Sequence, residues 1–314
     1  MVKEKVMQGK PARLCTREVF CVLVAAWGAV AALAEMADRP DVKYVAHQGE
    51  EFYAPGHSAP AYRFAVEHRL DFLKMDLRET KDGRIVLSHD ADLKASMNLD
   101  WRIRKHTLAE IKETGRFRPR GGFTNETIQT LEEGLEYAKR MPGIWLDFKD
   151  FSPAMAEKVL AAVAKAGISR DRVMVATWKT KALEYIAQKH PDIRRVAHTF
   201  VRPPERGWET NHAKGKEFKS EDEAIEAILA ERKRLGLYGF NMPHIKKRGS
   251  VVYHTTPSMI TKLKSAGAWV SIWFVNDAKT GEYYRKAGAD CFVTNSKANT
   301  RNPVPGAACK RAEP

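Results

Sequence analysis

Apolar runs rich in β-forming residues alternate with helical patterns along most of the chain, and this alternation constrains the fold more than any other feature. Eight such runs are predicted to be strands: Val42–Ala46, Phe72–Leu77, Ile144–Phe148, Val173–Thr177, Arg195–Thr199, Leu237–Asn241, Trp269–Phe274 and Cys291–Thr294. Strands that are separated by helices form parallel sheets covered by those helices. Eight of them are accommodated most economically in a closed sheet. We therefore predict an α/β protein with a (β/α)8 barrel, the TIM-barrel architecture.

Signals for helix starts lie between the predicted strands. Thr130 and Glu133 have the spacing of a capping box, and so do Ser220 and Glu223. In Thr256-Pro257, a proline follows a capping residue and takes a first helical position. These signals predict helices at points where a barrel requires them.

A ninth β-like run, Ile85–Ser88, follows the second predicted strand after only a short turn. That turn, Thr80–Gly83, ends in Asp-Gly, which is typical of a hairpin. Neighbouring parallel strands need a crossover of about a dozen residues or more, so this pair must be antiparallel. We expect a β-hairpin excursion after the second barrel strand, which returns His89 and Asp90 to the C-terminal mouth, where such barrels keep their chemistry.

The first 34 residues are predicted to be a secretory signal peptide. Basic residues begin the segment, Val19–Leu33 is apolar and uncharged, and Ala32-Leu33-Ala34 has the small-x-small pattern of a cleavage site. A single membrane anchor is the alternative, but the apolar run is shorter than the ~20 residues of a spanning helix. We expect cleavage after Ala34, a secreted or periplasmic location and no stable membrane anchor.

The rest of the chain is predicted to form one domain over residues 35–300, followed by an irregular tail at 301–314. Two segments, Leu93–Arg120 and Arg202–Lys219, are predicted to be insertions between barrel elements. The first is rich in arginine and lysine, and the second has the composition of a long loop. The sequence contains no repeat and no sign of a second core.

The chain of 314 residues has a net charge of +14, and removal of the leader, with five basic and two acidic residues, leaves +11. This basic balance suits an anionic partner, either a small substrate or a polyanion. No nucleic-acid-binding motif is present, so we expect no nucleic acid. Without the leader, Cys291 and Cys309 remain; a disulfide between them stays open, and no Cys-x-x-Cys motif is present.

Charged and imidazole side chains gather at the ends of the first three predicted strands. They are His47 after the first strand, Lys74 and Asp76 in the second, and Asp147 and Lys149 at the end of the third. Residues two apart in a strand point to the same side, so each Lys–Asp pair can face the mouth of the barrel. With His89 from the hairpin, two histidines, two aspartates and two lysines are predicted to meet there.

This set of side chains is suited to phosphodiester cleavage. One histidine can remove a proton from an attacking oxygen while the other protonates the leaving oxygen. Carboxylates can hold a hard divalent cation that neutralises phosphoryl charge, and a lysine can stabilise the negative charge of the transition state. Each residue alone also has a structural interpretation, such as an internal Asp–Lys ion pair. Their convergence on one mouth favours catalysis.

From Val45 almost to Asn299, the chain resembles the glycerophosphodiester phosphodiesterases. The matching motifs are His47-Gln48-Gly49 with Ala54–Ser58, Lys74–Asp76 with Thr80–Gly83 and His89-Asp90, Gln129–Glu133, Asp147–Lys149, Trp273–Asn276 and Val293–Asn295. Several motifs in the family's order make the resemblance far more specific than any single motif.

The resemblance implies a TIM-barrel hydrolase that cuts glycerophosphodiesters into glycerol phosphate and an alcohol. It implies catalytic roles for His47, His89 and Lys149, and metal ligation by Asp76 and Asp147. The implied cofactor is a divalent cation, Ca2+ or Mg2+. The implied partner is a small anionic phosphodiester.

Substrate contacts are also expected from Gln48 and Lys74, which depart from the family's motifs. Lys74 replaces an expected metal carboxylate, and Gln48 replaces an arginine that can bind phosphate through two hydrogen bonds. Gly56 and Asn295 replace acidic residues as well. Three outcomes stay open: a weakened metal site, an ammonium group in place of the metal, or a site that binds without turnover.

A set of aromatic residues supports a second enzyme hypothesis, a phospholipase D-like lipid phosphodiesterase that acts on lysophospholipids. The set comprises Trp178, Phe200, Trp208, Tyr238, Phe240, Trp269 and Trp273. We expect Trp178 and Trp273 to contact the substrate, and Trp208 is a further pocket candidate because it lies in a predicted loop. A third hypothesis is a non-catalytic, secreted basic protein that binds anionic ligands, which the charge of +11 and the arginine-rich segment 101–120 support.

Overall fold

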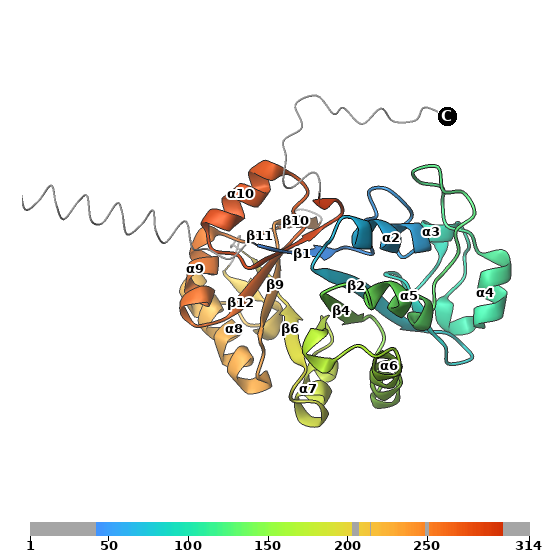
Figure 1. The fold of residues 1–314 in the computed structure, drawn as a ribbon. Helices are drawn as coiled ribbons and strands as arrows, with labels where there is room; N and C mark the ends of the chain where they lie inside the picture. Colours follow the sequence, from blue (N-terminus) through green and yellow to red (C-terminus); the bar gives the residue numbers. More distant parts are fainter. Residues whose placement is uncertain (1–41, 203–206, 214, 249–250, 298–314) are drawn as a thin grey trace, which may run out of the picture. The chain divides into compact units, whose positions relative to one another are not determined.

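Eight parallel strands close into a barrel in the computed structural model, which describes residues 42–297 except 203–206, 214 and 249–250 (Figure 1). The barrel strands are β1 (Lys43–Ala46), β2 (Phe72–Glu79), β4 (Gly143–Phe148), β5 (Val173–Thr177), β6 (Arg194–His198), β9 (Gly239–Pro243), β12 (Trp269–Trp273) and β13 (Cys291–Thr294). They are hydrogen-bonded in this order, and β1 pairs with both β2 and β13, so the ring is complete. The predicted (β/α)8 barrel is confirmed, and all eight predicted strands are present.

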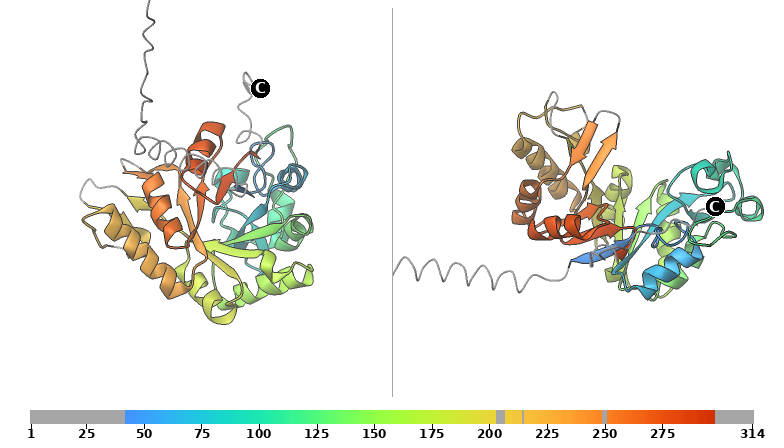
Figure 2. Two further views of the ribbon diagram at one scale, coloured as in Figure 1. Left: turned by 60° about the vertical axis from the view of Figure 1, so that its left-hand side comes forward. Right: turned by 90° about the horizontal axis from the view of Figure 1, so that it is seen from above.

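Helices cover the outside of the ring of strands (Figures 1 and 2). They are α2 (Ala59–Glu67), α5 (Leu131–Ala138), α6 (Pro153–Lys165), α7 (Thr180–Lys189), α8 (Glu221–Leu235), α9 (Pro257–Ser265) and α10 (Ala278–Lys286), with a 3-10 turn η2 (Arg170–Arg172) before β5. The capping box at the start of α5 is complete, with both of its hydrogen bonds. At α8 only half of the predicted box forms, because the Glu223 side chain accepts from the backbone of Lys219 rather than Ser220.

The interior of the barrel is apolar beneath its mouth. It is filled by Val45, Trp145, Met174, Ala176, Val196, Cys291 and Val293, all almost fully buried. Trp145 and Asp147 are two residues apart in β4 and so point to the same side of the sheet. The apolar layer around Trp145 therefore forms the base on which the polar side chains at the mouth rest.

The predicted hairpin after the second strand is confirmed, with β3 (Ile85–Leu87) antiparallel to β2. β2 extends to Glu79, beyond the predicted end, because Leu77–Glu79 pair with β3. The turn residue Gly83 has a φ of +73°, a left-handed conformation that glycine adopts without strain.

The first predicted insertion folds against the hairpin as α3 (Lys94–Met97), the 3-10 turn η1 (Ile103–Lys105) and α4 (Leu108–Thr114). Its apolar side chains form a small cluster of their own: Val86, Leu93, Met97, Ile103, Ile111, Phe117 and Ile128. This cluster is a satellite of the barrel, which it joins through Val86 of β3.

The second predicted insertion is less irregular than a long loop. It contains β7 (Val201–Arg202) and β8 (Glu209–Thr210), which pair as antiparallel strands, and the 3-10 turn η3 (Asn211–Ala213). A further hairpin, β10 (Ile245–Arg248) with β11 (Val251–His254), follows β9 and was not predicted; the right view of Figure 2 shows it in orange.

The predicted leader, the tail at 301–314 and Cys309 lie outside the described residues. Cys291 is buried in β13 and is a free thiol among the residues described. Within residues 42–297 as described, no helix combines the length and the apolar character that crossing a bilayer requires.

Candidate active site

A pocket of about 460 Å³ opens at the C-terminal ends of the barrel strands. Eight of the nine predicted site residues line it: His47, Gln48, Lys74, His89, Asp147, Lys149, Trp178 and Trp273. The ninth, Asp76, lies beneath the lining and has no exposed surface. Four residues that were not predicted complete the lining: His198, Asn241, Phe274 and Val293.

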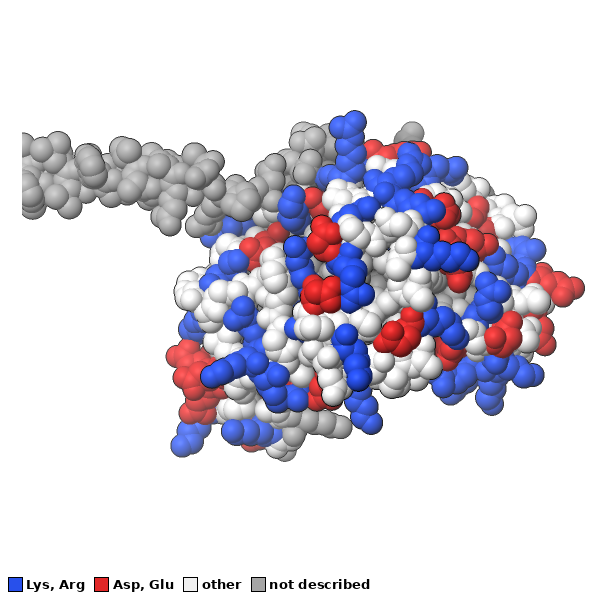
Figure 3. Space-filling view, turned by 60° about the horizontal axis from the view of Figure 1, so that its bottom comes forward, with Lys and Arg blue, Asp and Glu red and all other residues white. Residues whose placement is uncertain are grey.

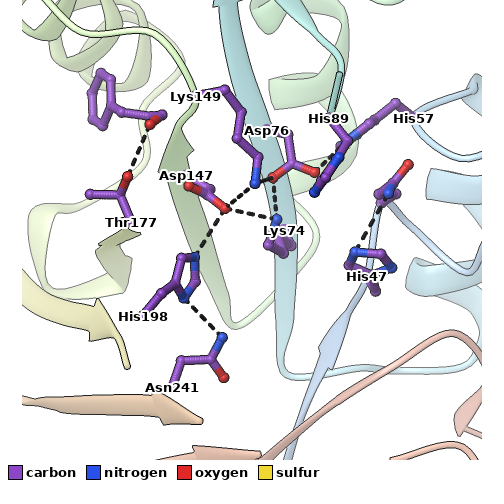
Figure 4. Close-up of polar contacts among 12 residues, drawn as sticks. His47, His57, Lys74, Asp76, His89, Asp147, Lys149, Thr177, His198 and Asn241 are labelled. Carbon is purple, nitrogen blue, oxygen red and sulfur yellow. Dashed lines mark hydrogen bonds and ion pairs between the residues drawn. The ribbon is translucent and has the colours of Figure 1, made fainter. Parts of the chain in front are cut away.

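Two lysines and two aspartates form the floor of this pocket, and we call Lys74, Asp76, Asp147 and Lys149 the charge cluster (Figure 4). Asp76 and Asp147 are direct neighbours in the register of β2 and β4. The Lys74 ammonium group contacts Asp76 and lies 3.1 Å from Asp147 Oδ2. Lys149 Nζ lies 2.8 Å from Asp147 Oδ2 and 3.4 Å from Asp76 Oδ1. Each ammonium group therefore bridges both carboxylates.

Burial and opposite charge act against each other in this cluster. Burial alone would raise the pKa of Asp76, but Lys74 and Lys149 hold that pKa well below its usual value. The pKa of Asp147 is likewise lowered, because Lys74, His198 and Lys149 outweigh the effect of burial. For Lys149, burial is outweighed by Asp76 and Asp147, which raise the pKa of the amine. Both carboxylates are thus ionised at neutral pH.

Two buried histidines hold the carboxylates in place from opposite sides. His57 Nε2 lies 2.9 Å from Asp76 Oδ2, and its Nδ1 lies 2.7 Å from the hydroxyl of Tyr62. His198 Nε2 donates to Asp147 Oδ2 at 3.0 Å, while its Nδ1 accepts from the Asn241 amide at 3.0 Å. Burial lowers the pKa of both imidazoles. They act as neutral hydrogen-bonding supports of the charge cluster.

Neither of these supports was predicted from the sequence, although signals for both were present. His198 ends β6, so the strand-end argument that selected Asp147 applies to it as well. His57 lies in the Ala54–Ser58 motif that carries the family resemblance. The fold of the loop between β1 and α2 brings its imidazole to Asp76 of β2.

His47 is held firmly at the end of β1. Its Nδ1 lies 3.0 Å from Glu51 Oε1 and 3.0 Å from Asn295 Oδ1, so a proton on Nδ1 leaves Nε2 as an acceptor on the pocket side, where the Gln48 amide lies 3.5 Å away. Its ring packs on Phe274 with 4.4 Å between the ring centroids. The tight turn after it needs Gly49, which has a φ of +80° and whose absent Cβ would lie 2.7 Å from the backbone of Ala61.

His89 is held more loosely, after β3. Its Nδ1 lies 2.8 Å from Asp90 Oδ1, and 49% of its side chain is exposed. Arg78 fixes the backbone at this point by donating to the carbonyl of His89 at 2.7 Å and pairing with Asp150. Burial, followed by the charge of Lys149, lowers the pKa of His89.

The charge cluster does not fit a divalent cation in the way that the family resemblance implies. Asp76 uses Oδ1 for the ammonium groups and Oδ2 for His57. Asp147 uses Oδ2 for Lys74, Lys149 and His198, and only its Oδ1 lacks a hydrogen-bond partner among the described residues. No group of three or more His, Cys, Asp or Glu side chains within those residues is arranged to hold a metal ion. The two predicted metal ligands are brought together, but as partners of lysine.

The aromatic part of the pocket is built from fewer residues than the sequence suggested. Trp178 is 40% exposed, and its ring is nearly perpendicular to that of Trp273, with 6.4 Å between their centroids. Phe200 packs beside Trp178 at 6.1 Å. Trp208 was a wrong candidate, because it packs against the main hydrophobic core through its pairing with Phe218.

The arrangement as a whole is suited to holding and cleaving an anion. Two imidazoles line one pocket above a floor that presents ammonium groups, and aromatic rings form another wall. Ammonium donors fixed in this way can stabilise phosphoryl oxygens, and the imidazoles can exchange protons with attacking and leaving oxygens.

Comparisons with known proteins agree with this geometry. A protein of Bacillus subtilis described as a glycerophosphodiester phosphodiesterase is 28% identical over 173 residues, which cover 48% of this chain and only 57% of that protein. Another from the same organism, described as the putative glycerophosphodiester phosphodiesterase YhdW, is 23% identical over 254 residues, which cover 80% of this chain and 93% of that protein.

Solved structures show the same fold at low identity. A putative glycerophosphoryl diester phosphodiesterase from Silicibacter pomeroyi has a TM-score of 0.64 at 19% identity, covering 82% of this chain and 91% of that one. An Oleispira antarctica phosphodiesterase, solved with the product sn-glycerol-3-phosphate, has a TM-score of 0.62 at 20% identity, covering 81% and 92%.

The strongest comparison is with a family model. The model of the glycerophosphoryl diester phosphodiesterase family matches residues 47–298, which begin at His47 and extend past β13. This range includes every residue of the pocket described above. The chain therefore belongs to the glycerophosphoryl diester phosphodiesterase family.

Proposed function

We propose that this protein is an exported phosphodiesterase that hydrolyses glycerophosphodiesters to glycerol phosphate and an alcohol. The observation that carries the proposal is the pair His47 and His89, which line one pocket over the charge cluster in a barrel of this family. The export rests on the predicted leader, with its apolar run and the cleavage pattern Ala32-Leu33-Ala34.

In the proposed reaction, the lysines of the charge cluster stabilise charge and the two histidines transfer protons. Lys74 and Lys149 attract the phosphoryl oxygens and stabilise the negative charge that develops on them. One imidazole takes the proton of an attacking water as the new P–O bond forms, and the other protonates the alcohol oxygen as its P–O bond breaks. His47 Nε2 is suited to such exchange because Glu51 and Asn295 engage its Nδ1.

Hydrolysis of a substrate panel tests this proposal directly. We expect ³¹P NMR to show glycerol phosphate released from glycerophosphocholine, glycerophosphoethanolamine or glycerophosphoglycerol by the purified protein. His47→Ala and His89→Ala should each lower turnover by about two orders of magnitude or more, because each removes one proton-transfer group. The mass of protein purified from the exported fraction should correspond to a chain that starts at Glu35.

His190→Ala serves as the matched control, since His190 pairs with Glu157 on the helical outside of the barrel and does not line the pocket. Circular dichroism should show that all three variants fold. Near-normal turnover in both His47→Ala and His89→Ala would contradict the assignment.

The aromatic rings that line the pocket favour a second candidate function, that of a lipid phosphodiesterase. Trp178 and Trp273 stand perpendicular at the pocket edge, which suits an acyl chain or a quaternary ammonium head group. Lysophosphatidylcholine belongs in the same panel for this reason. Preferential hydrolysis of the lysophospholipid, with a loss of that preference in Trp178→Ala, would favour the lipid activity.

A non-catalytic basic binding protein is the third possibility. The face of the molecule in Figure 3 shows lysine and arginine interspersed with acidic residues rather than gathered into one patch. Binding through surface charge should weaken steeply with salt and persist in His47→Ala. Binding of that kind without any hydrolysis would replace the enzymatic proposal.

A further inference from the structure

We propose that the ammonium group of Lys74 takes the place of the divalent cation on which this family generally depends, so that this protein needs no metal ion. The inference rests on the proposed phosphodiesterase function and concerns how the same site stabilises the phosphoryl group. Three independent features of the charge cluster and its surroundings carry it.

The first feature is the position of Lys74. Its Nζ lies between the two carboxylates, in contact with Asp76 and 3.1 Å from Asp147 Oδ2. The side chain is 5% exposed, so the ammonium group has little access to bulk water and cannot easily leave this position. A divalent ion placed between the same carboxylates would meet two ammonium groups at short range, and like charges repel strongly there.

The second feature is the balance of charges and hydrogen bonds. Two ammonium groups face two ionised carboxylates, so the cluster is neutral without an added ion. Three of the four carboxylate oxygens already have partners, and only Asp147 Oδ1 lacks one within the described part of the chain. A hard cation such as Ca2+ takes six or more oxygen ligands, and without displacing a lysine the cluster offers it only Asp147 Oδ1, so water would have to supply nearly all the others.

The third feature lies at the other positions that depart from the family's motifs. Gly56 stands where the motif has an acidic residue, and a Cβ added there would lie 2.5 Å from Gln48 Oε1 and 3.1 Å from Glu51 Oε2. The side chain of Gln48 therefore extends into the space that a longer residue at position 56 would enter. Asn295, another replacement of an acidic residue, binds His47 Nδ1 as a neutral group. Two motif positions thus lack the negative charge expected there, while Glu51 keeps one carboxylate beside His47.

These features assign Lys74 a catalytic role. Both Lys74 and Lys149 line the pocket, so their charge reaches a bound phosphoryl group directly. An ammonium group supplies positive charge and hydrogen-bond donors, but it does not lower the pKa of a bound water as a metal does. Proton removal from the attacking oxygen must therefore depend on the histidines alone.

Metal removal and direct metal binding test the inference together. After exhaustive dialysis against a chelator, we expect glycerophosphocholine hydrolysis with EDTA to stay within about twofold of that with added Ca2+ or Mg2+. Isothermal titration calorimetry of the unmodified protein should detect no binding of either ion at millimolar concentration. Stoichiometric binding of one ion per chain, or activity that EDTA abolishes and the metal restores, would overturn the proposal.

Substitution of Lys74 provides a second test. Lys74→Glu adds a third carboxylate between Asp76 and Asp147, so we expect this variant to bind Ca2+ in calorimetry and to lose at least tenfold of its activity in EDTA. Lys74→Met should lower turnover by about a hundredfold, the scale for removing one transition-state donor, without rescue by metal. Lys158→Glu is the control, because Lys158 pairs with Glu79 outside the pocket and should leave metal behaviour unchanged.

The outcomes separate this inference from the proposed function. If no phosphodiester is hydrolysed, the proposed function fails, while calorimetry still decides whether Lys74 fills a cation site. If Lys74→Glu does not fold, the calorimetry of the unmodified protein decides. A folded Lys74→Glu variant that gains no metal binding would contradict the placement of Lys74 where the cation would bind.

Discussion

The floor of the pocket and the histidines above it are built in different ways. Three members of the charge cluster lie in the adjacent barrel strands β2 and β4, and Lys149 directly follows β4; each side chain is 12% exposed or less and contacts two groups of opposite charge. His47 and His89 both lie after strands, and loop side chains hold their Nδ1 atoms: Glu51 and Asn295 for His47, and Asp90 for His89. In the proposed mechanism the difference separates two tasks: the floor supplies charge that folding fixes, and the histidines supply protons that can move.

The two histidines also differ from each other. His47 is 6% exposed and has two acceptors at Nδ1, whereas His89 is about half exposed and has one. In the proposed acid–base pair, His47 is the rigid member and His89 is the member that can adjust to the substrate. Variants of the charge cluster and of the residues that hold the histidines test whether the two parts of the site differ in this way.

Loss of one floor charge should have the largest effect, and it should appear in stability. Asp76→Asn leaves Lys74 and Lys149 with a single ionised partner, and breaking a buried ion pair costs about 3–5 kcal/mol of unfolding free energy. Urea denaturation followed by circular dichroism measures it. Glu79 lies on β2, the same strand as Asp76, and pairs with the exposed Lys158 of α6. Glu79→Gln should cost less than about 1 kcal/mol of unfolding free energy. Equal losses of unfolding free energy in Asp76→Asn and Glu79→Gln would show that the charge cluster stabilises the fold no more than a surface ion pair does.

A change beside the rigid histidine should affect catalysis and leave stability nearly unchanged. Glu51→Gln weakens the hold on His47 Nδ1, and misplacement of a catalytic group costs on the order of ten- to a hundredfold in rate. The loss should fall on kcat with KM unchanged, because the phosphate contacts of the floor remain. Glu67→Gln, exposed on α2, is the control. A rise in KM with normal kcat would assign Glu51 to substrate binding instead.

The sequence predicted the barrel well because its strands are buried on both faces. Runs such as Val173–Thr177 are apolar throughout and are bounded by helix signals, which leaves little ambiguity. Of the hairpin that was missed, β10 contains the charged Lys246 and Lys247 and lacks the apolar signal of a barrel strand, whereas the apolar run Val251–Tyr253 of β11 carries a strand signal that was not used.

The candidate site was predictable to the extent that strand ends define it. Lys74, Asp147 and Lys149 follow from the alternation of side chains along a strand, and the structure places all three at the pocket. Glu51 and His57 were not found, since their roles depend on how the β1–α2 loop folds back onto β1 and β2. Trp208 was misplaced for the same reason, because loop composition alone does not tell a pocket wall from a core contact.

The pH dependence of kcat/KM is the most direct test of acid–base catalysis by His47 and His89. If one imidazole accepts a proton while the other donates one, the profile should be bell-shaped. Burial and Lys149 lower the pKa of His89, and its hydrogen bond to Asp90 opposes them. Asp90→Asn keeps an accepting oxygen but removes the negative charge that favours the imidazolium, so it should lower the pKa of His89 further and move one limb of the bell to lower pH, while the other limb stays in place. A profile that is flat between about pH 5 and 9 would contradict the account, because no histidine pair could then be exchanging protons with the substrate.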